Sequence, residues 1–271
     1  MELVIRPKKT LSMNDITELW QYRELLFFFS WRDLKVRYKQ TVIGVLWAIF
    51  QPFITMVVFS VFFGKLAKIP SDGMPYPIFV YTGLLVWLFF SSSLSETSDC
   101  LVSNQSIVTK VYFPRLILPL SIIVTKLVDF CVASVVLLGL MFYYHYQPQL
   151  LGLALFPFLL FFTFLSASGL GLILASVNVK YRDVRYILPF FIQSLLFLTP
   201  VIYPASIAGK YAWLMMINPM TGIINAARAS LLGSIPFDWQ ALLVSCIASS
   251  VFFVIGTIIF KKTERYFADV A

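Results

Sequence analysis

The chain has 271 residues, of which 59% are hydrophobic and only 13% are charged, and its mean hydropathy is +0.85. A soluble domain of this size needs a polar surface that such a composition cannot supply, so a bilayer must accept the apolar side chains. Unbroken apolar runs of helix-spanning length, rather than short alternating segments, favour helices over a β-barrel. We therefore predict an all-α membrane protein.

The charged and reactive side chains exclude several functions. The net charge of +8 is not gathered into one basic surface, because the basic residues flank alternate ends of the apolar runs, so we predict no nucleic-acid partner. Three distant cysteines indicate neither a metal site nor a disulfide framework. The single histidine, His145, lies at a predicted helix end without paired carboxylates, and we expect no catalytic site.

Six apolar runs predict six transmembrane helices within a membrane domain of residues 42–260. Their approximate bounds are 42–64, 77–97, 116–144, 150–176, 187–203 and 239–260. The predicted cytoplasmic segments hold all Lys and Arg residues except Lys65, Lys68, Lys126, Lys210 and Arg228. By the positive-inside rule, both termini should then face the cytoplasm.

Residues 1–41 precede the first span and carry hydrophobic residues at helical spacing. These are Ile16, Leu19, Trp20, Leu26, Phe27 and Trp31. Acidic residues fall elsewhere on the helical wheel, which predicts an amphipathic helix in the cytoplasmic membrane interface. Residues 261–271 are expected to form a short cytoplasmic tail.

The segment 204–236 is apolar but is interrupted by prolines and glycines. Its two pieces, of about ten residues each, are too short to cross a hydrocarbon core of ~30 Å. Irregular backbone at this depth is tolerated only where protein or a water-filled cavity surrounds it. We therefore predict re-entrant half-helices between the fifth and sixth spans.

Short motifs stand in order along nearly the whole chain. They are Trp31–Tyr38, Gly44–Trp47, Gln51-Pro52, Asn104, Lys110, Phe113-Pro114-Arg115, Asn178, Arg182-Asp183, Thr199–Tyr203, Asn218-Pro219 and Arg228. Each motif is weak alone, but the ordered set resembles the ABC-2 type permeases that export polysaccharides and polyol phosphates. That family includes O-antigen, capsule and teichoic-acid exporters.

The resemblance implies a homodimer of this chain in the bacterial cytoplasmic (inner) membrane, associated with two separate ATPase subunits. The substrate would be a lipid-linked polysaccharide of O-antigen or capsular type. The chain has no Walker A loop, because Phe59 and Pro204 stand where the first glycine would precede Gly64-Lys65 and Gly209-Lys210. ATP and Mg²⁺ are therefore expected in the partner subunit, with no cofactor, metal or enzymatic activity in this chain.

The resemblance also implies a coupling helix at about 98–110, which would dock into the ATPase. Its polar contacts would come from Ser103, Asn104, Gln105, Ser106 and Lys110. A solvated loop is the alternative that the residues alone leave open.

The basic stretch before the first span holds candidate contacts for a lipid pyrophosphate or for lipid headgroups. These are Arg32, Lys35, Arg37 and Lys39. Basic side chains bind phosphate well, yet topology-setting charges on ordinary phospholipid explain them at least as well.

The 27 Phe, 13 Tyr and 6 Trp residues include candidates for a channel lining. On the first and fifth spans these are Trp47, Phe50, Phe53, Phe190, Phe197 and Tyr203. Aromatic faces make weak contacts at many sites, which suits conduction of a sugar polymer. For any single residue, packing in the core remains the stronger interpretation.

Two further groups lie within the membrane. Lys126 and Asp129 are spaced i, i+3 in the third span and should pair with each other, and we expect no further carboxylate at that depth. The outer gate is expected to involve Pro219, Asn225 and Arg228.

The main alternative function is a secondary transporter or channel that works without an ATPase. Such a protein would favour acidic residues within the membrane or an inverted repeat. A third alternative, a membrane glycosyltransferase or lipid-modifying enzyme, is disfavoured because the spans lack acid and base groups for catalysis.

Overall fold

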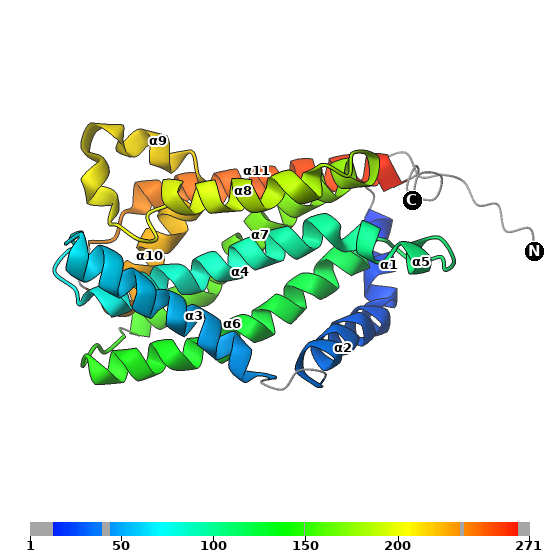
Figure 1. The fold of residues 1–271 in the computed structure, drawn as a ribbon. Coiled ribbons are helices and arrows are strands. Elements are labelled where there is room, and N and C mark those ends of the chain that lie inside the picture. The colour runs from blue at the N-terminus through cyan, green and yellow to red at the C-terminus, as the bar shows by residue number, and fades with distance from the viewer. Residues whose placement is uncertain (1–12, 40–43, 149, 234–235, 265–271) are drawn as a thin grey trace, which may run out of the picture.

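The computed structural model describes residues 13–39, 44–148, 150–233 and 236–264. These residues form helices, turns and loops, with no strand among them. The prediction of an all-α protein is confirmed for this part of the chain. Figure 1 shows the helices gathered into one elongated bundle.

Five helical stretches are long and apolar enough to cross a membrane. They are α3 (Leu46–Phe59) with its π-helical continuation η1 (Ser60–Leu66), α4 (Tyr76–Ser103), α6 (Ile117–Tyr143), α7 (Leu150–Lys180) and α11 (Trp239–Thr263). The fifth predicted span corresponds to α8 (Val184–Leu198), which has 15 residues. At 1.5 Å per residue α8 is about 22 Å long, shorter than the ~30 Å of hydrocarbon.

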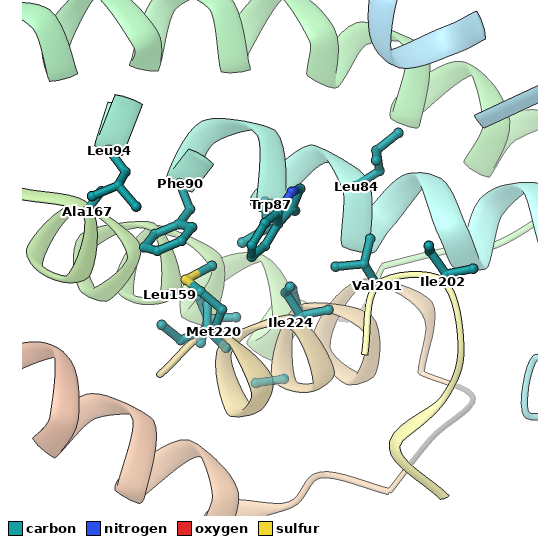
Figure 2. Close-up of a cluster of buried hydrophobic side chains, with 14 of the residues drawn as sticks. Leu84, Trp87, Phe90, Leu94, Leu159, Ala167, Val201, Ile202, Met220 and Ile224 are labelled. Atoms are coloured by element: carbon teal, nitrogen blue, oxygen red, sulfur yellow. The ribbon is translucent and has the colours of Figure 1, made fainter. Parts of the chain in front are cut away.

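Helix α4 forms the centre of the bundle and is buried along most of its length. It contacts α3, α6, α7, α8 and α10. Figure 2 shows Leu84, Trp87 and Phe90 of α4 beside Met220 and Ile224 of α10 in one buried cluster.

Helices α7 and α11 pack with their backbones in contact. A Cβ added to Gly169 would lie 2.5 Å from the backbone nitrogen of Phe253, and Gly256 faces the backbone of Gly169 in return. Glycine is therefore required at this crossing.

The N-terminal helix is divided into α1 (Met13–Gln21) and α2 (Arg23–Lys39). Helix α2 packs against α6, where the Ser30 hydroxyl donates to the Ser121 carbonyl at 3.3 Å. The ring of Phe29 is buried against Phe113, whereas Phe27 is 68% exposed. One face of α2 thus holds it to the bundle while another presents aromatic rings outward.

The segment 204–236 differs from the two equal half-helices that we expected. It contains η2 (Ala205–Tyr211), α9 (Ala212–Met216) and α10 (Pro219–Leu232), so its α-helices have 5 and 14 residues. Helix α10 starts where the Asn218 side chain accepts a hydrogen bond from the Met220 N–H at 3.0 Å, and it ends at Gly233, whose φ is 65°. It is buried against α4, α7 and α11.

The two ends of the bundle carry different elements. Helices η2 and α9 lie at one end, and α5 (Gln105–Val108) lies at the opposite end, together with α1 and the last turn of α11 (Figure 1). We name these the α9 end and the α5 end.

Candidate functional site

At the α9 end, α10 directs Arg228 into the interior, where its side chain is fully buried. The guanidinium donates to the carbonyls of Phe79, Pro200 and Val201 at 3.1, 2.6 and 2.6 Å, and it lies 3.7 Å from the centroid of the Phe79 ring. Gly83 leaves room for this arrangement, because a Cβ there would collide with the guanidinium. We call Arg228 and its three carbonyl acceptors the arginine clamp. It joins α4, α10 and the segment that follows α8.

Further hydrogen bonds hold the same segment. The Asn218 amide donates to the Thr199 hydroxyl at 2.6 Å, and the Tyr76 hydroxyl donates to the Ile202 carbonyl at 2.7 Å. The predicted gate residue Pro219 is buried in the first turn of α10, and Asn225 is partly buried. The structure thus brings Pro219, Asn225 and Arg228 onto one helix beside a fixed break after α8, and their gate role stays a prediction.

Between the two ends, five side chains from three helices form a charge cluster. Arg37 of α2 bonds both oxygens of Glu96 at 3.0 and 3.1 Å and also pairs with Asp129. Lys126 pairs with Glu96 and lies 3.8 Å from Asp129, and the Tyr38 hydroxyl donates to Asp129. The cluster therefore ties α2 to α4 and α6.

The electrostatics of the α2 members follow from these partners. Burial lowers the pKa of Arg37, but Glu96 and Asp129 outweigh burial and leave its pKa above the usual value. Burial and the hydrogen bond to Asp129 raise the pKa of Tyr38. Arg37 is therefore charged and Tyr38 remains a hydroxyl donor at neutral pH.

The predicted pairing of Lys126 with Asp129 was incomplete. Lys126 does face Asp129, but its nearer partner is Glu96, a third ionisable side chain within the membrane spans. The expectation that no further carboxylate lies at this depth was wrong. A single acidic residue near the end of an apolar run is the signal that could have identified Glu96, because intramembrane charges are seldom left unpaired.

A cavity of about 630 Å³ adjoins the charge cluster. Besides the five cluster residues, its lining comprises Gly44, Trp47, Ala48, Gln51, Pro52, Leu85, Leu88, Phe89, Ser92, Phe130 and Ala133. Helices α3, α4 and α6 supply the apolar wall, and the charges occupy one side.

The four predicted basic contacts lie in different surroundings. Lys35 and Lys39 are exposed, whereas Arg37 belongs to the charge cluster. Arg32 pairs with Asp33, lies over the Phe29 ring and donates to the Asn104 side chain at 3.2 Å. Only the two lysines have fully outward positions.

The predicted coupling helix at 98–110 is not one helix. Residues 98–103 are the last turns of α4, and α5 is a single turn. The division falls at Asn104, whose amide folds back to the Cys100 carbonyl at 2.9 Å. Ser103, Ser106 and Lys110 are exposed, while Gln105 and Asn104 are partly buried.

Next to this segment, Asp99 connects α4 with α7 and α8. Arg185 donates to Asp99 at 2.8 Å, and the buried Asn178 amide donates to the Asp99 carboxylate at 3.3 Å and to the Ser98 carbonyl at 3.0 Å. A displacement of this end of α4 would therefore also move α7 and α8.

The candidate channel aromatics are exposed on this single chain, with one exception. Trp47, Phe50 and Phe53 on α3 are 56%, 46% and 41% exposed. Phe190 and Phe197 on α8 are 74% and 52% exposed. Tyr203 is partly buried and packs against the core. Among the described residues, no group of three or more His, Cys, Asp and Glu side chains could hold a metal ion.

Comparison with known proteins assigns the family. Residues 24–232 match the model of the ABC-2 type transporter family. The chain belongs to this family. It is 30% identical to the O-antigen export system permease protein RfbA of Myxococcus xanthus over 94% of this chain and 98% of that protein. It is 26% identical to an RfbA of Klebsiella pneumoniae (91% and 95%) and 22% identical to the polysialic acid transport protein KpsM of Escherichia coli (86% and 91%).

Family membership and the apolar helices identify a multi-pass permease of the bacterial inner membrane. ABC-2 permeases are not themselves enzymes and work with ATPase subunits. The match covers the arginine clamp, the charge cluster and α5, which all lie between residues 24 and 232.

Proposed function

We propose that this chain is the membrane permease of an ATP-driven exporter that moves a lipid-linked polysaccharide of O-antigen or capsular type. The observation that carries the proposal is the end-to-end match with an O-antigen export permease, which covers 94% of this chain and 98% of that protein. A match of this extent includes spans, connecting segments and both buried polar sites rather than one shared hydrophobic stretch.

The proposed topology has six crossings, with the α5 end and both termini in the cytoplasm. Helix α8 would complete the fifth of these crossings together with residues 199–203, which follow it without helical structure. Helices η2, α9 and α10 would form the re-entrant gate at the outer surface. The positive-inside rule supports this orientation.

Coupling to the ATPase is assigned to the α5 end. Ser103, Asn104, Gln105, Ser106 and Lys110 offer polar contacts next to buried residues that fix the segment to the bundle. Because α4 runs directly from this segment to the arginine clamp, a push on α5 would be transmitted along the centre of the bundle. ATP and Mg²⁺ would be held by the partner.

The channel is assigned to the interface of a homodimer. The aromatic faces of α3 and α8 are exposed on one chain and would meet a second copy or the substrate. Rings without directional hydrogen bonds would let a sugar polymer slide past. Arg32, Lys35 and Lys39 would attract the lipid pyrophosphate at the membrane surface.

The decisive experiment deletes the chain from its host and follows lipid-linked glycan on both sides of the inner membrane. We expect glycan to accumulate on the cytoplasmic side and to be exported again when the chain is supplied together with its ATPase. A neighbouring gene for a Walker A ATPase and copurification of the two proteins would support the same assignment. Export by a chain that never associates with an ATPase would favour a secondary transporter instead.

A further inference from the structure

The charge cluster contains as many acidic as basic side chains. Arg37 and Lys126 face Glu96 and Asp129 across one side of the cavity, so two positive charges meet two negative charges. Lys126 is only 6% exposed and Asp129 23%. The cavity wall is thus formally neutral but strongly polar.

This balance disfavours a purely anionic ligand. A pyrophosphate that approached Arg37 would also meet two carboxylates, and like charges in a partly buried site repel strongly. A ligand that carries one positive and one negative group has no such penalty. Its anion can bond Arg37 and Lys126 while its cation bonds Glu96 and Asp129.

The position of the cavity along the helices also suits an amphipathic ligand. Glu96 lies seven residues before the end of α4, about 10 Å along the helix, and Lys126 lies nine residues after the start of α6, about 14 Å. Since α4 is about 42 Å long, its ends extend beyond ~30 Å of hydrocarbon, which leaves the cluster close to the headgroup level of one leaflet.

Further along α4 and α6, away from the charges, the lining becomes apolar. Leu85, Leu88, Phe89 and Phe130 contribute hydrocarbon and aromatic surface, and Trp47 of α3 is 56% exposed beside them. The volume of about 630 Å³ lies within the range of small-ligand sites, roughly 300–1,000 Å³. A headgroup and the first part of an acyl chain would fit this division of polar and apolar surface.

We propose that this cavity is a binding site for the headgroup of a zwitterionic phospholipid with a primary ammonium, such as phosphatidylethanolamine. The phosphate would be received by Arg37 and Lys126 and the ammonium by Glu96 and Asp129, while the acyl chains follow the apolar wall. The Tyr38 hydroxyl and the Gln51 amide, which also line the cavity, would supply further polar contacts. The proposal concerns a resident lipid and does not depend on which substrate is exported.

The test measures lipid retention by the full chain, with any copurifying partner, after mild detergent extraction. Native mass spectrometry would compare phosphatidylethanolamine, phosphatidylcholine and phosphatidylglycerol offered at equal concentration. We expect phosphatidylethanolamine to be retained about tenfold more than either competitor, the order expected for one charge-assisted hydrogen bond. Equal retention of the three, or preference for either competitor, would overturn the proposal.

Substitutions of the cavity carboxylates test whether the lipid binds in the cavity. Glu96→Gln combined with Asp129→Asn leaves two cations without carboxylates, so the preference should reverse toward the anionic phosphatidylglycerol. Asp129→Asn alone should reduce the preference for phosphatidylethanolamine. The matched control Glu24→Gln removes an exposed carboxylate from the same helix as Arg37, outside the cavity, and should leave the preference unchanged.

Because the readout is a ratio between lipids on the folded chain, a lower yield of a variant does not imitate the expected result. An unchanged ratio in both cavity variants, or a change in Glu24→Gln equal to theirs, would assign the retained lipid to the outer surface of the bundle and refute the site. Export need not be measured, so failure of this proposal is distinct from failure of the proposed function.

Discussion

The arginine clamp and the charge cluster neutralise buried cations in different ways. At the α9 end, Arg228 is bound by three backbone carbonyls, and no carboxylate of the described residues lies within ion-pair distance. In the charge cluster, Arg37 and Lys126 are bound by side chains of α4 and α6. Backbone acceptors cannot change partner unless a helix moves, whereas carboxylates can turn to another donor. The clamp should therefore be rigid, whereas the side chains of the cluster can rearrange.

The largest effect is expected from breaking the arginine clamp. Arg228→Ala removes the hydrogen bonds that the guanidinium donates to three buried carbonyls, at about 1–3 kcal/mol each, so the chain should lose about 3 kcal/mol of stability or more. Arg228→Lys retains the charge but cannot reach three divergent acceptors, and it should behave almost like Arg228→Ala. Thermal unfolding in detergent measures both losses.

The control for the clamp is Arg185→Ala, which removes an arginine whose side chain is 53% exposed and pairs with Asp99. Exposed ion pairs contribute little to stability, so the melting temperature should change little. If Arg228→Lys were as stable as the native chain, the three-carbonyl geometry would not be what rigidifies the α9 end.

A second close contact lies where the backbones of α7 and α11 meet. Gly169→Ala places a Cβ 2.5 Å from the Phe253 backbone nitrogen, which is closer than van der Waals contact. Such overpacking typically costs about 1–3 kcal/mol. Gly139→Ala is the matched control, because no atom lies within 4 Å of its Cβ position on α6. That change should stabilise slightly, by up to about 1 kcal/mol, through the helix propensity of alanine. Equal melting temperatures for the two variants would contradict close contact.

The spans were predictable because the signal is local. Apolar runs at 116–144 and 150–176 are visible without knowledge of any partner, and α6 and α7 lie there. The start and end of α10 were also written locally, in Asn218-Pro219 and in Gly233. The prediction of two equal half-helices was wrong, but these ends of α10 are readable from the sequence because capping involves residues two or three positions apart.

The charge cluster was not predictable in the same way. Lys126 has a partner three positions away, Asp129, and this pair was identified from spacing alone. Glu96 lies 30 positions from Lys126 and 59 from Arg37 along the chain, so only the packing of α2 and α6 on α4 reveals their contact. The extension of α4 to Ser103 was missed because its last turns are polar and resemble a loop.

An intermediate effect is expected within the charge cluster. Glu96→Gln removes the nearer partner of the buried Lys126 and should cost about 1–3 kcal/mol. Adding Lys126→Met removes the buried cation that would retain only Asp129, at 3.8 Å, as its partner, so the double variant should recover most of that loss. Denaturation of both single variants and the double variant gives the coupling. If the losses of the two single variants added up in the double variant, Glu96 and Lys126 would contribute to stability independently. The cluster would then not act as a coupled group.

The smallest effect on stability is expected at the α5 end, where Lys110 is exposed. Lys110→Glu should change the free energy of unfolding by no more than about 0.5 kcal/mol. If the segment docks an ATPase, the same change should still reduce copurification of the two proteins, because a rim charge affects association more than folding. Lys262→Glu, an exposed charge reversal on the last turn of α11 at the same end, is the control and should leave association intact. Loss of association in both variants would indicate a general electrostatic effect, and loss in neither would remove Lys110 from the docking surface. Loss in Lys110→Glu alone would place Lys110 on the surface that docks the ATPase, because the matched charge reversal at the same end leaves association intact.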